Sequence, residues 1–197
     1  MTAGSRGRET IAQRRERRTA IDDPAVVLNA AARFLEARSR SVAEVRRRLT
    51  QTGYRPELVD GAIERLLDLG MLDDEAFARA WVESRDRARP RGERAIRSEL
   101  GLKGVDRASV DLVLAERRET AEATRDPDDV AVSADWAAAE KLIARHARAL
   151  ARVADPRQRR QRAYALLSRH GFDPETCRDV AALVDAEEAA EPHGAED

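Results

Sequence analysis

Apolar residues recur every three or four positions along most of this chain, which is the spacing that lines one face of an α-helix. Three of these stripes end in the same phrase, in which a glycine follows a leucine by four positions: Leu49 to Gly53, Leu100 to Gly104 and Leu167 to Gly171. Another apolar stripe follows each phrase. Self-similarity at intervals of roughly 50–65 residues predicts a tandem array of helical units. Such an array offers an extended surface rather than a pocket.

Short local signals mark where the helices of the first unit begin and end. Asp23-Pro24 has the residue types of an N-cap and a first helical position, and Ser41 to Glu44 has the spacing of a capping box. Gly53 is expected to end the second helix with a positive φ, and a third helix follows from Pro56 to the region of Gly70.

The same reasoning along the chain divides it into three repeats with connecting segments. We expect an all-α protein with three tandem three-helix repeats. The ranges are a flexible Arg-rich arm at 1–22, repeats at 23–71, 72–119 and 133–188, an acidic linker at 120–132 and a disordered acidic tail at 189–197.

The formal net charge of −1 hides a strong segregation of charge. From Arg33 to Arg55 there are seven basic residues against two acidic ones, and from Arg145 to Arg169 eight arginines against one aspartate. From Asp173 to Asp197 nine acidic residues stand against one arginine. Such blocks indicate a charged partner, such as nucleic acid or a protein surface, or else solvated helix faces.

Candidate chemistry changes this picture little. The three histidines are scattered, and aligning the repeat glycines puts the one cysteine, Cys177, at a core position equivalent to Val59 and Val110. Asp73 and Asp74 precede an apolar helix, where capping explains them better than acid–base or metal chemistry. We therefore expect no enzyme, no cofactor and no metal. With no stretch of about 18 apolar residues and no secretory signal, a cytoplasmic protein is expected.

The second and third helices of each repeat resemble a helix-turn-helix in outline only. The third helices expose acids such as Glu57, Asp60 and Glu64, which would repel phosphates, so reading of a DNA major groove is disfavoured. The basic residues are on the preceding helices, where they favour electrostatic contact with phosphate backbones without base specificity.

At the second repeat the sequence becomes specific enough to suggest a family. The run from Leu72-Asp73-Asp74 through Phe77, Ala78 and Trp81 to Arg85 resembles the L-D-D-x-x-[FY]-A-x-x-[FWY]-x-x-x-R signature of RecX regulatory proteins. The following Gly92, Ile96, Leu100 and Gly104 are similar to that family's next segment. The resemblance covers about Val26 to Val184, and we take ten residues as its structural motif: Leu72, Asp73, Asp74, Phe77, Ala78, Trp81, Gly92, Ile96, Leu100 and Gly104.

The resemblance implies an elongated, curved protein that binds RecA and its nucleoprotein filament on DNA. It implies modulation, mostly inhibition, of recombinase and coprotease activity in DNA repair and the SOS response. A nucleic-acid-binding helical repeat protein that acts without RecA is the alternative. The candidate contacts with RecA or DNA are Arg46, Arg47, Arg48, Arg85, Arg89, Arg91, Arg94, Arg97, Lys103, Arg157, Arg159, Arg160 and Arg162.

Overall fold

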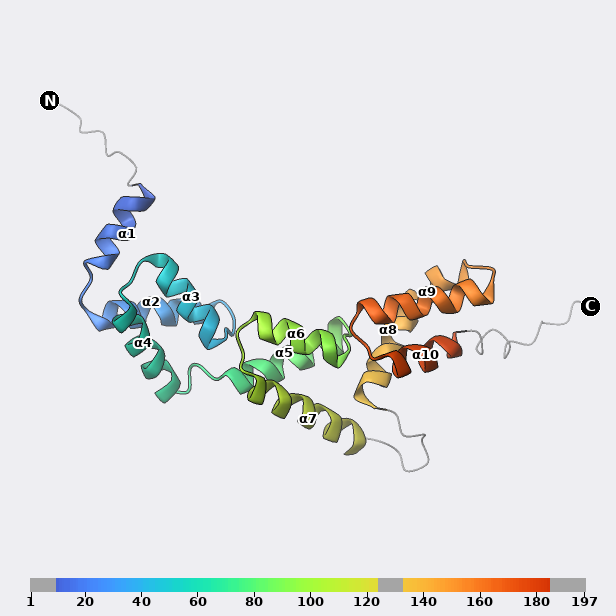
Figure 1. Cartoon of the computed structure of the whole chain (residues 1–197). Helices are drawn as coiled ribbons and strands as arrows, with labels where there is room; N and C mark the ends of the chain where they lie inside the picture. Colours follow the sequence, from blue (N-terminus) through green and yellow to red (C-terminus); the bar gives the residue numbers. More distant parts are fainter. Residues whose placement is uncertain (1–9, 124–132, 185–197) are drawn as a thin grey trace, which may run out of the picture. The chain divides into compact units, whose positions relative to one another are not determined.

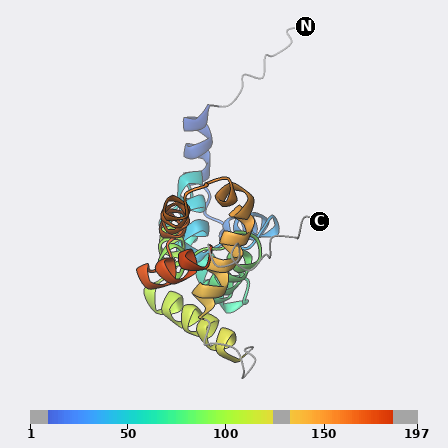
Figure 2. The same cartoon turned by 90° about the vertical axis from the view of Figure 1, so that its right-hand side faces the viewer.

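The computed structural model describes residues 10–123 and 133–184, and all regular structure within these ranges is helical (Figures 1 and 2). This confirms the all-α class. The helices are α1 Ile11–Thr19, α2 Pro24–Glu36, α3 Val42–Thr52, α4 Pro56–Asp68, α5 Asp74–Ala88, α6 Glu93–Leu102, α7 Arg107–Ala123, α8 Ala134–Ala151, α9 Pro156–Arg169 and α10 Pro174–Leu183.

The chain forms two compact units. The first comprises residues 1–77 with 103–105, and the second comprises 78–102 with 106–197. Helix α5 begins in the first unit and continues in the second. The elongated, curved arrangement of the repeats stays a prediction.

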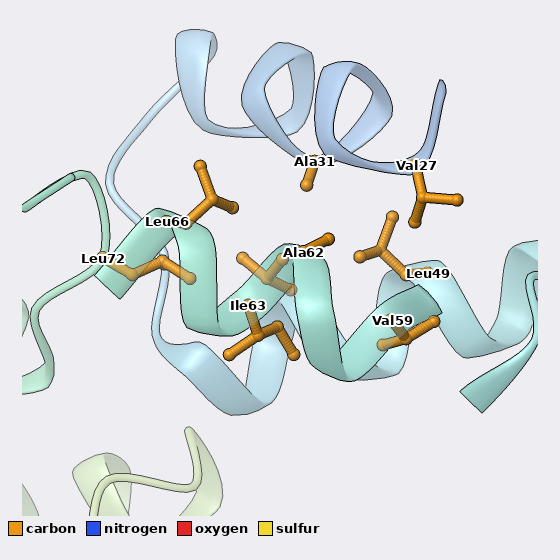
Figure 3. Packing of buried hydrophobic residues seen from close by; sticks show 9 residues of the cluster. Val27, Ala31, Leu49, Val59, Ala62, Ile63, Leu66 and Leu72 are labelled. Carbon is orange, nitrogen blue, oxygen red and sulfur yellow. The ribbon is translucent and has the colours of Figure 1, made fainter. Parts of the chain in front are cut away.

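In the first unit α2, α3 and α4 pack on one another as a three-helix repeat (Figure 3). Asp23 caps α2 by accepting a hydrogen bond from the Ala25 amide at 2.9 Å, as its sequence position predicted. The core is filled by the inward stripes of the three helices: Val27, Ala31, Val45, Leu49, Val59, Ala62, Ile63, Leu66 and Leu72. Burial of these side chains is the main favourable term that holds the repeat together.

The predicted glycine ends are confirmed. Gly53 closes α3 with a φ of 103°, and Gly104 and Gly171 have φ values of 78° and 85°. Side chains other than hydrogen disfavour this left-handed conformation, which explains glycine at the same place in each repeat.

The residues at the start of α3 bond to a segment that lies far along the chain. Ser41 accepts from the Glu44 amide at 3.2 Å and donates to the Lys103 carbonyl at 2.6 Å. The reciprocal bond of a capping box is replaced, because the Glu44 carboxylate pairs with Lys103 at 2.8 Å and Arg38 at 3.1 Å. Asp74 accepts from the Val42 amide at 2.9 Å. These bonds bring Lys103–Val105 into the first unit.

The first unit also holds α1, and the second unit holds most of α5 and helices α6 to α10. Asp73 caps the start of α5 through the Ala76 amide at 2.9 Å, so the two motif aspartates cap different helices. Helices α8, α9 and α10 pack together as the third repeat, around Leu142, Leu167, Phe172, Cys177 and Val180. Cys177 is fully buried, as the glycine alignment predicted, and burial raises the pKa of its thiol. A thiol of this kind is inert.

Helix α6 meets the end of α9 within this unit. The Gly92 amide donates to the His170 carbonyl at 3.0 Å, and a Cβ at Gly92 would collide with the backbone of Gly171 and Phe172. The motif glycine at 92 is therefore required by a close approach of two backbones.

Two predicted boundaries differ from the structure. Residues 11–19, expected to belong to a flexible arm, form α1, whose start is capped by Thr10 and Gln13. Its Thr19 hydroxyl donates to the Gly53 carbonyl at 3.1 Å. Helix α7 continues to Ala123, into the expected linker. The rest of the linker, residues 1–9 and the tail lie outside the described residues.

Over the described ranges, no helix is both long enough and apolar enough to cross a membrane.

Candidate interaction surface

The predicted contact residues belong to the second helix of each repeat and to the residues beside it. In the first repeat Arg46, Arg47 and Arg48 are all exposed on α3. Arg46 pairs with Asp60 of α4, and Arg48 lies over the Phe34 ring, 5.8 Å from its centroid. Arg40 covers the same ring at 4.2 Å. Part of the positive charge is therefore held by neighbouring side chains of this unit.

In the second repeat, the signature residues form a polar contact between α5 and α6. The Trp81 indole nitrogen and Arg85 Nε donate to the same Glu99 oxygen, at 2.8 and 2.6 Å. The Arg85 guanidinium also stacks 4.3 Å from the Trp81 ring centroid. Arg91 approaches the other Glu99 oxygen at 3.7 Å. Arg85 and Arg91 thus hold the two helices together, whatever else they bind.

The other predicted contacts of this repeat fall into two groups. Arg97 pairs with Asp111 and, at 3.5 Å, with Glu93, and Lys103 pairs with Glu44. Arg89 and Arg94 are exposed, and no carboxylate of residues 10–123 or 133–184 forms an ion pair with either. Arg94 is therefore the charge that α6 presents most directly to a partner.

In the third repeat one predicted contact residue is misplaced. Arg159 is only 5% exposed, and its Nε donates to the Val153 carbonyl at 3.1 Å. It lies on the inner face of α9 and ties the α8–α9 turn to that helix, so its assignment to the surface was wrong. Arg157, Arg160 and Arg162 are exposed on α9.

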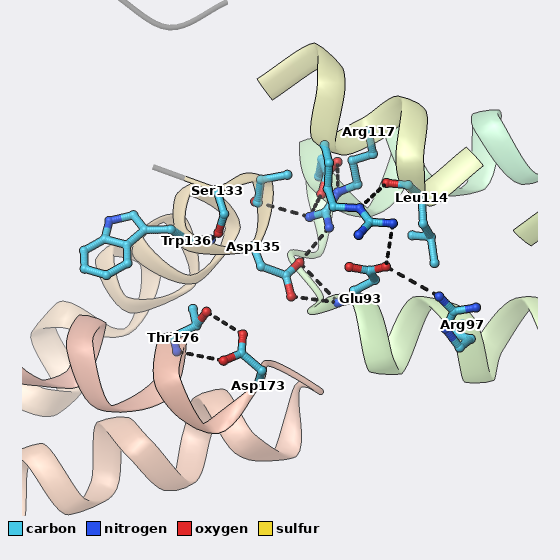
Figure 4. Close-up of polar contacts among 12 residues, drawn as sticks. Glu93, Arg97, Leu114, Arg117, Ser133, Asp135, Trp136, Asp173 and Thr176 are labelled. Carbon is cyan, nitrogen blue, oxygen red and sulfur yellow. Dashed lines mark hydrogen bonds and ion pairs between the residues drawn. The ribbon is translucent and has the colours of Figure 1, made fainter. Parts of the chain in front are cut away.

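The sequence did not predict a largely buried ionic group, which is centred on Arg117 of α7 (Figure 4). Its side chain is 6% exposed and binds Asp86 of α5 through two nitrogens at 2.8 and 2.9 Å. It also donates to Asp135 of α8 at 2.6 Å. Burial opposes its charge, but the hydrogen bonds to the two aspartates prevail and raise the pKa of Arg117.

The Arg117 group joins the second and third repeats inside the second unit. Asp135 also accepts from the Glu93 amide at 3.0 and 3.2 Å, so it caps α6 while it pairs with α7. One feature of the sequence indicates the buried position of Arg117: it falls three residues after Leu114 and seven after Val110, on an apolar stripe. A charge at such a position predicts a buried partner.

Within the described ranges, no group of three or more His, Cys, Asp or Glu side chains is placed to hold a metal ion. What the site presents is a set of exposed arginines on α3, α6 and α9. Several of them have no carboxylate partner in the described part of the chain, and each helix carries at least one, such as Arg47, Arg94 and Arg162. Cations of this kind suit phosphates or acidic protein groups.

Three family models match the chain in order. Residues 28–66 match the first three-helix domain of RecX, residues 73–114 the second and residues 133–180 the third. These ranges correspond to helices α2–α4, α5–α7 and α8–α10, respectively. The three predicted three-helix repeats are thereby confirmed.

Curated relatives agree with these matches. The chain is 33% identical over 156 residues to the regulatory protein RecX of Mycobacterium avium strain 104, which covers 79% of this chain and 83% of that protein. Over a shorter stretch of 84 residues it is 44% identical to RecX of Mycobacterium sp. strain KMS, covering 43% of this chain. That alignment spans 46% of the KMS protein, about half the length of the relative it matches.

The fold is shared with solved structures. The crystal structure of RecX from Lactobacillus salivarius aligns with a TM-score of 0.68 at 19% identity, covering 84% of this chain and 98% of that one. A second crystal structure of regulatory protein RecX aligns with a TM-score of 0.65 at 20% identity, over 81% and 71% of the two chains. The chain therefore belongs to the RecX family of regulatory proteins.

Proposed function

We propose that this protein binds RecA and RecA–DNA filaments and modulates, mostly by inhibition, recombinase and coprotease activity, as the family resemblance implies. It would act in DNA repair and the SOS response as a cytoplasmic regulator rather than an enzyme. The observation that carries the proposal is the repetition of exposed arginines on equivalent second helices of three family domains. A repeated cationic surface can bind a repeated anionic partner at several points at once.

The charges differ in how freely they can bind such a partner. Arg46, Arg85, Arg91, Arg97 and Lys103 each have an acidic neighbour. A new anion must compete with that carboxylate at these positions. Arg47, Arg94 and Arg162 are among the candidates with no such competitor in the described residues, and each lies on a different second helix, so we assign the main contacts to these three.

The test is a charge reversal on the second helices with a matched reversal on helices outside both proposed contact surfaces. R47E/R94E/R162E should weaken inhibition of RecA strand exchange by about tenfold or more, since three contacts of about 0.5–1 kcal/mol are replaced by repulsion. The control, R33E/R107E/R178E, changes the net charge equally on α2, α7 and α10 and should inhibit as the wild type does. Equal loss in both variants would mean that net charge matters rather than this surface.

The alternative function, nucleic-acid binding without RecA, rests on the same arginines because phosphates attract them without any protein partner. Labelled single-stranded DNA should be titrated with and without RecA at two salt concentrations. The proposed function predicts a preference for the filament. Tight, strongly salt-dependent binding to naked DNA with no gain from RecA would favour the alternative.

A further inference from the structure

The C-terminal end of α4 exposes three large apolar side chains within five residues. Leu67 is 44% exposed, Leu69 50% and Met71 49%. We call these three residues the apolar end of α4. Elsewhere in the described ranges, exposed large apolar residues occur singly, at Val26, Leu102, Leu112, Tyr164 and Leu183. Single exposed apolar residues are ordinary, whereas a group of them marks an interaction surface.

This end of the helix is held in one conformation by its backbone. The Met71 amide donates to the Leu66 carbonyl and the Gly70 amide to the Leu67 carbonyl, both at 2.9 Å, which is the Schellman pattern. Gly70 supplies the positive φ of 65° that this turn requires. On either side of the turn, Leu66 and Leu72 are buried in the core of the first unit (Figure 3). The backbone that carries the exposed groups is therefore ordered before any partner arrives, which lowers the entropic cost of binding.

The charge around the apolar end selects the kind of partner. From Glu64 to Asp74 the chain has four acids against Arg65 alone, and Glu64, Asp68 and Asp73 are exposed. Phosphates would be repelled here, and they have no apolar surface with which to cover leucine and methionine. A protein surface with an apolar recess bordered by lysine or arginine is complementary in both respects.

We propose that the apolar end of α4 docks a protein partner of that chemistry, and that this partner is RecA. The inference rests on the proposed function and extends it, because it separates the two contacts of the molecule. The exposed arginines of the second helices meet anions, and the end of the third helix in the first repeat meets an apolar, basic-bordered recess of the protein. Removal of the apolar groups should then weaken the binding of this protein to RecA and leave its affinity for DNA unchanged.

The experiment uses the full chain with Leu67→Ser and Met71→Ser together. The control variant carries Leu112→Ser and Leu183→Ser, two residues of similar exposure (44% and 41%) on α7 and α10. Half-inhibition of RecA strand exchange should require about tenfold more of the L67S/M71S protein, whereas the control should match the wild type. Both variants should bind labelled single-stranded DNA with wild-type affinity and salt dependence. Thermal unfolding checks that each variant is folded.

Four outcomes would overturn an assignment. Wild-type inhibition by L67S/M71S would remove the docking role and leave the proposed function intact. A parallel loss of DNA affinity would make this end a nucleic-acid surface. A change in oligomeric state by sedimentation, seen only in L67S/M71S, would make the occupant a second copy of this chain. A wild-type protein that neither binds nor inhibits RecA would reject the proposed function, and the docking assignment to RecA with it.

Discussion

A single side chain, Arg117, shows how much one residue of this protein can determine. Its own side chain is 6% exposed, and from α7 it bonds to Asp86 of α5 and Asp135 of α8 at 2.6–2.9 Å. Removal of the guanidinium leaves the largely buried Asp135 carboxylate without its charge partner. We expect R117M to lower the free energy of unfolding by about 3 kcal/mol, measured by urea denaturation. A loss below about 0.5 kcal/mol, the usual range of a surface residue, would contradict this account.

The Glu44 carboxylate makes the stability of the first unit depend on pH. Burial opposes its charge, but hydrogen bonds from Lys103 and Arg38 outweigh burial and lower its pKa from the ordinary value of 4.5. A carboxylate with a lowered pKa in the folded state stabilises the fold above pH 4.5, and this contribution is lost as the pH falls through the folded pKa.

E44Q should therefore be less stable than the wild type at pH 6, and the difference should shrink as the pH falls below 4.5. Urea unfolding of both proteins at a series of pH values measures it. A difference that is independent of pH would show that the charge of Glu44 contributes nothing and that only its shape matters.

At the scale of elements, Gly92, which comes just before α6, and Gly101, which lies within it, allow a matched comparison of two glycine-to-alanine substitutions. A Cβ at Gly92 would strike the backbone of Gly171 and Phe172, whereas a Cβ at Gly101 meets nothing within 4 Å. G92A should destabilise by about 3 kcal/mol because two helices must separate. G101A should stabilise by about 0.5–1 kcal/mol because alanine is the better helix former. Thermal unfolding distinguishes them, and equal effects would disprove the contact between α6 and α9.

The helices themselves were predictable because their signals are local. Asp23 and Ser41 each cap a helix that the sequence marked, and the apolar stripes are buried as their spacing required. Side-chain partners were predicted less well, because they depend on residues far away in the sequence. Glu44 has capping-box spacing, yet its carboxylate binds Lys103, 59 residues later.

The candidate surface shows the same limit. Arg159 stands among Arg157, Arg160 and Arg162, and nothing in the spacing of a charged run tells which member faces inward. Only the Val153 carbonyl, placed by the turn between α8 and α9, decides it. Helix α1 was missed for another reason: it has no apolar stripe, and its hydrogen bonds to Thr52 and Gly53 involve backbone carbonyls that carry no sequence signal.

For the whole molecule, the division into two compact units predicts where a local defect is felt. The Arg117 group lies in the second unit, and the cluster around Leu49 lies in the first. Proteins open in cooperative parts, and a mutation accelerates hydrogen exchange in the part whose opening it favours. R117M should therefore raise amide exchange in α6–α10 and leave α2–α4 nearly unchanged, as measured by mass spectrometry.

L49A should give the opposite map, because it leaves a cavity in the core of α2–α4 that costs about 2–5 kcal/mol. The two variants serve as each other's control, since both remove a buried side chain and differ only in the unit that contains it. If either substitution accelerated exchange equally in both units, the chain would open as one cooperative body. In that case the hydrogen bonds of Ser41 and Glu44 to Lys103 would be strong enough to couple the fate of the first repeat to that of the second.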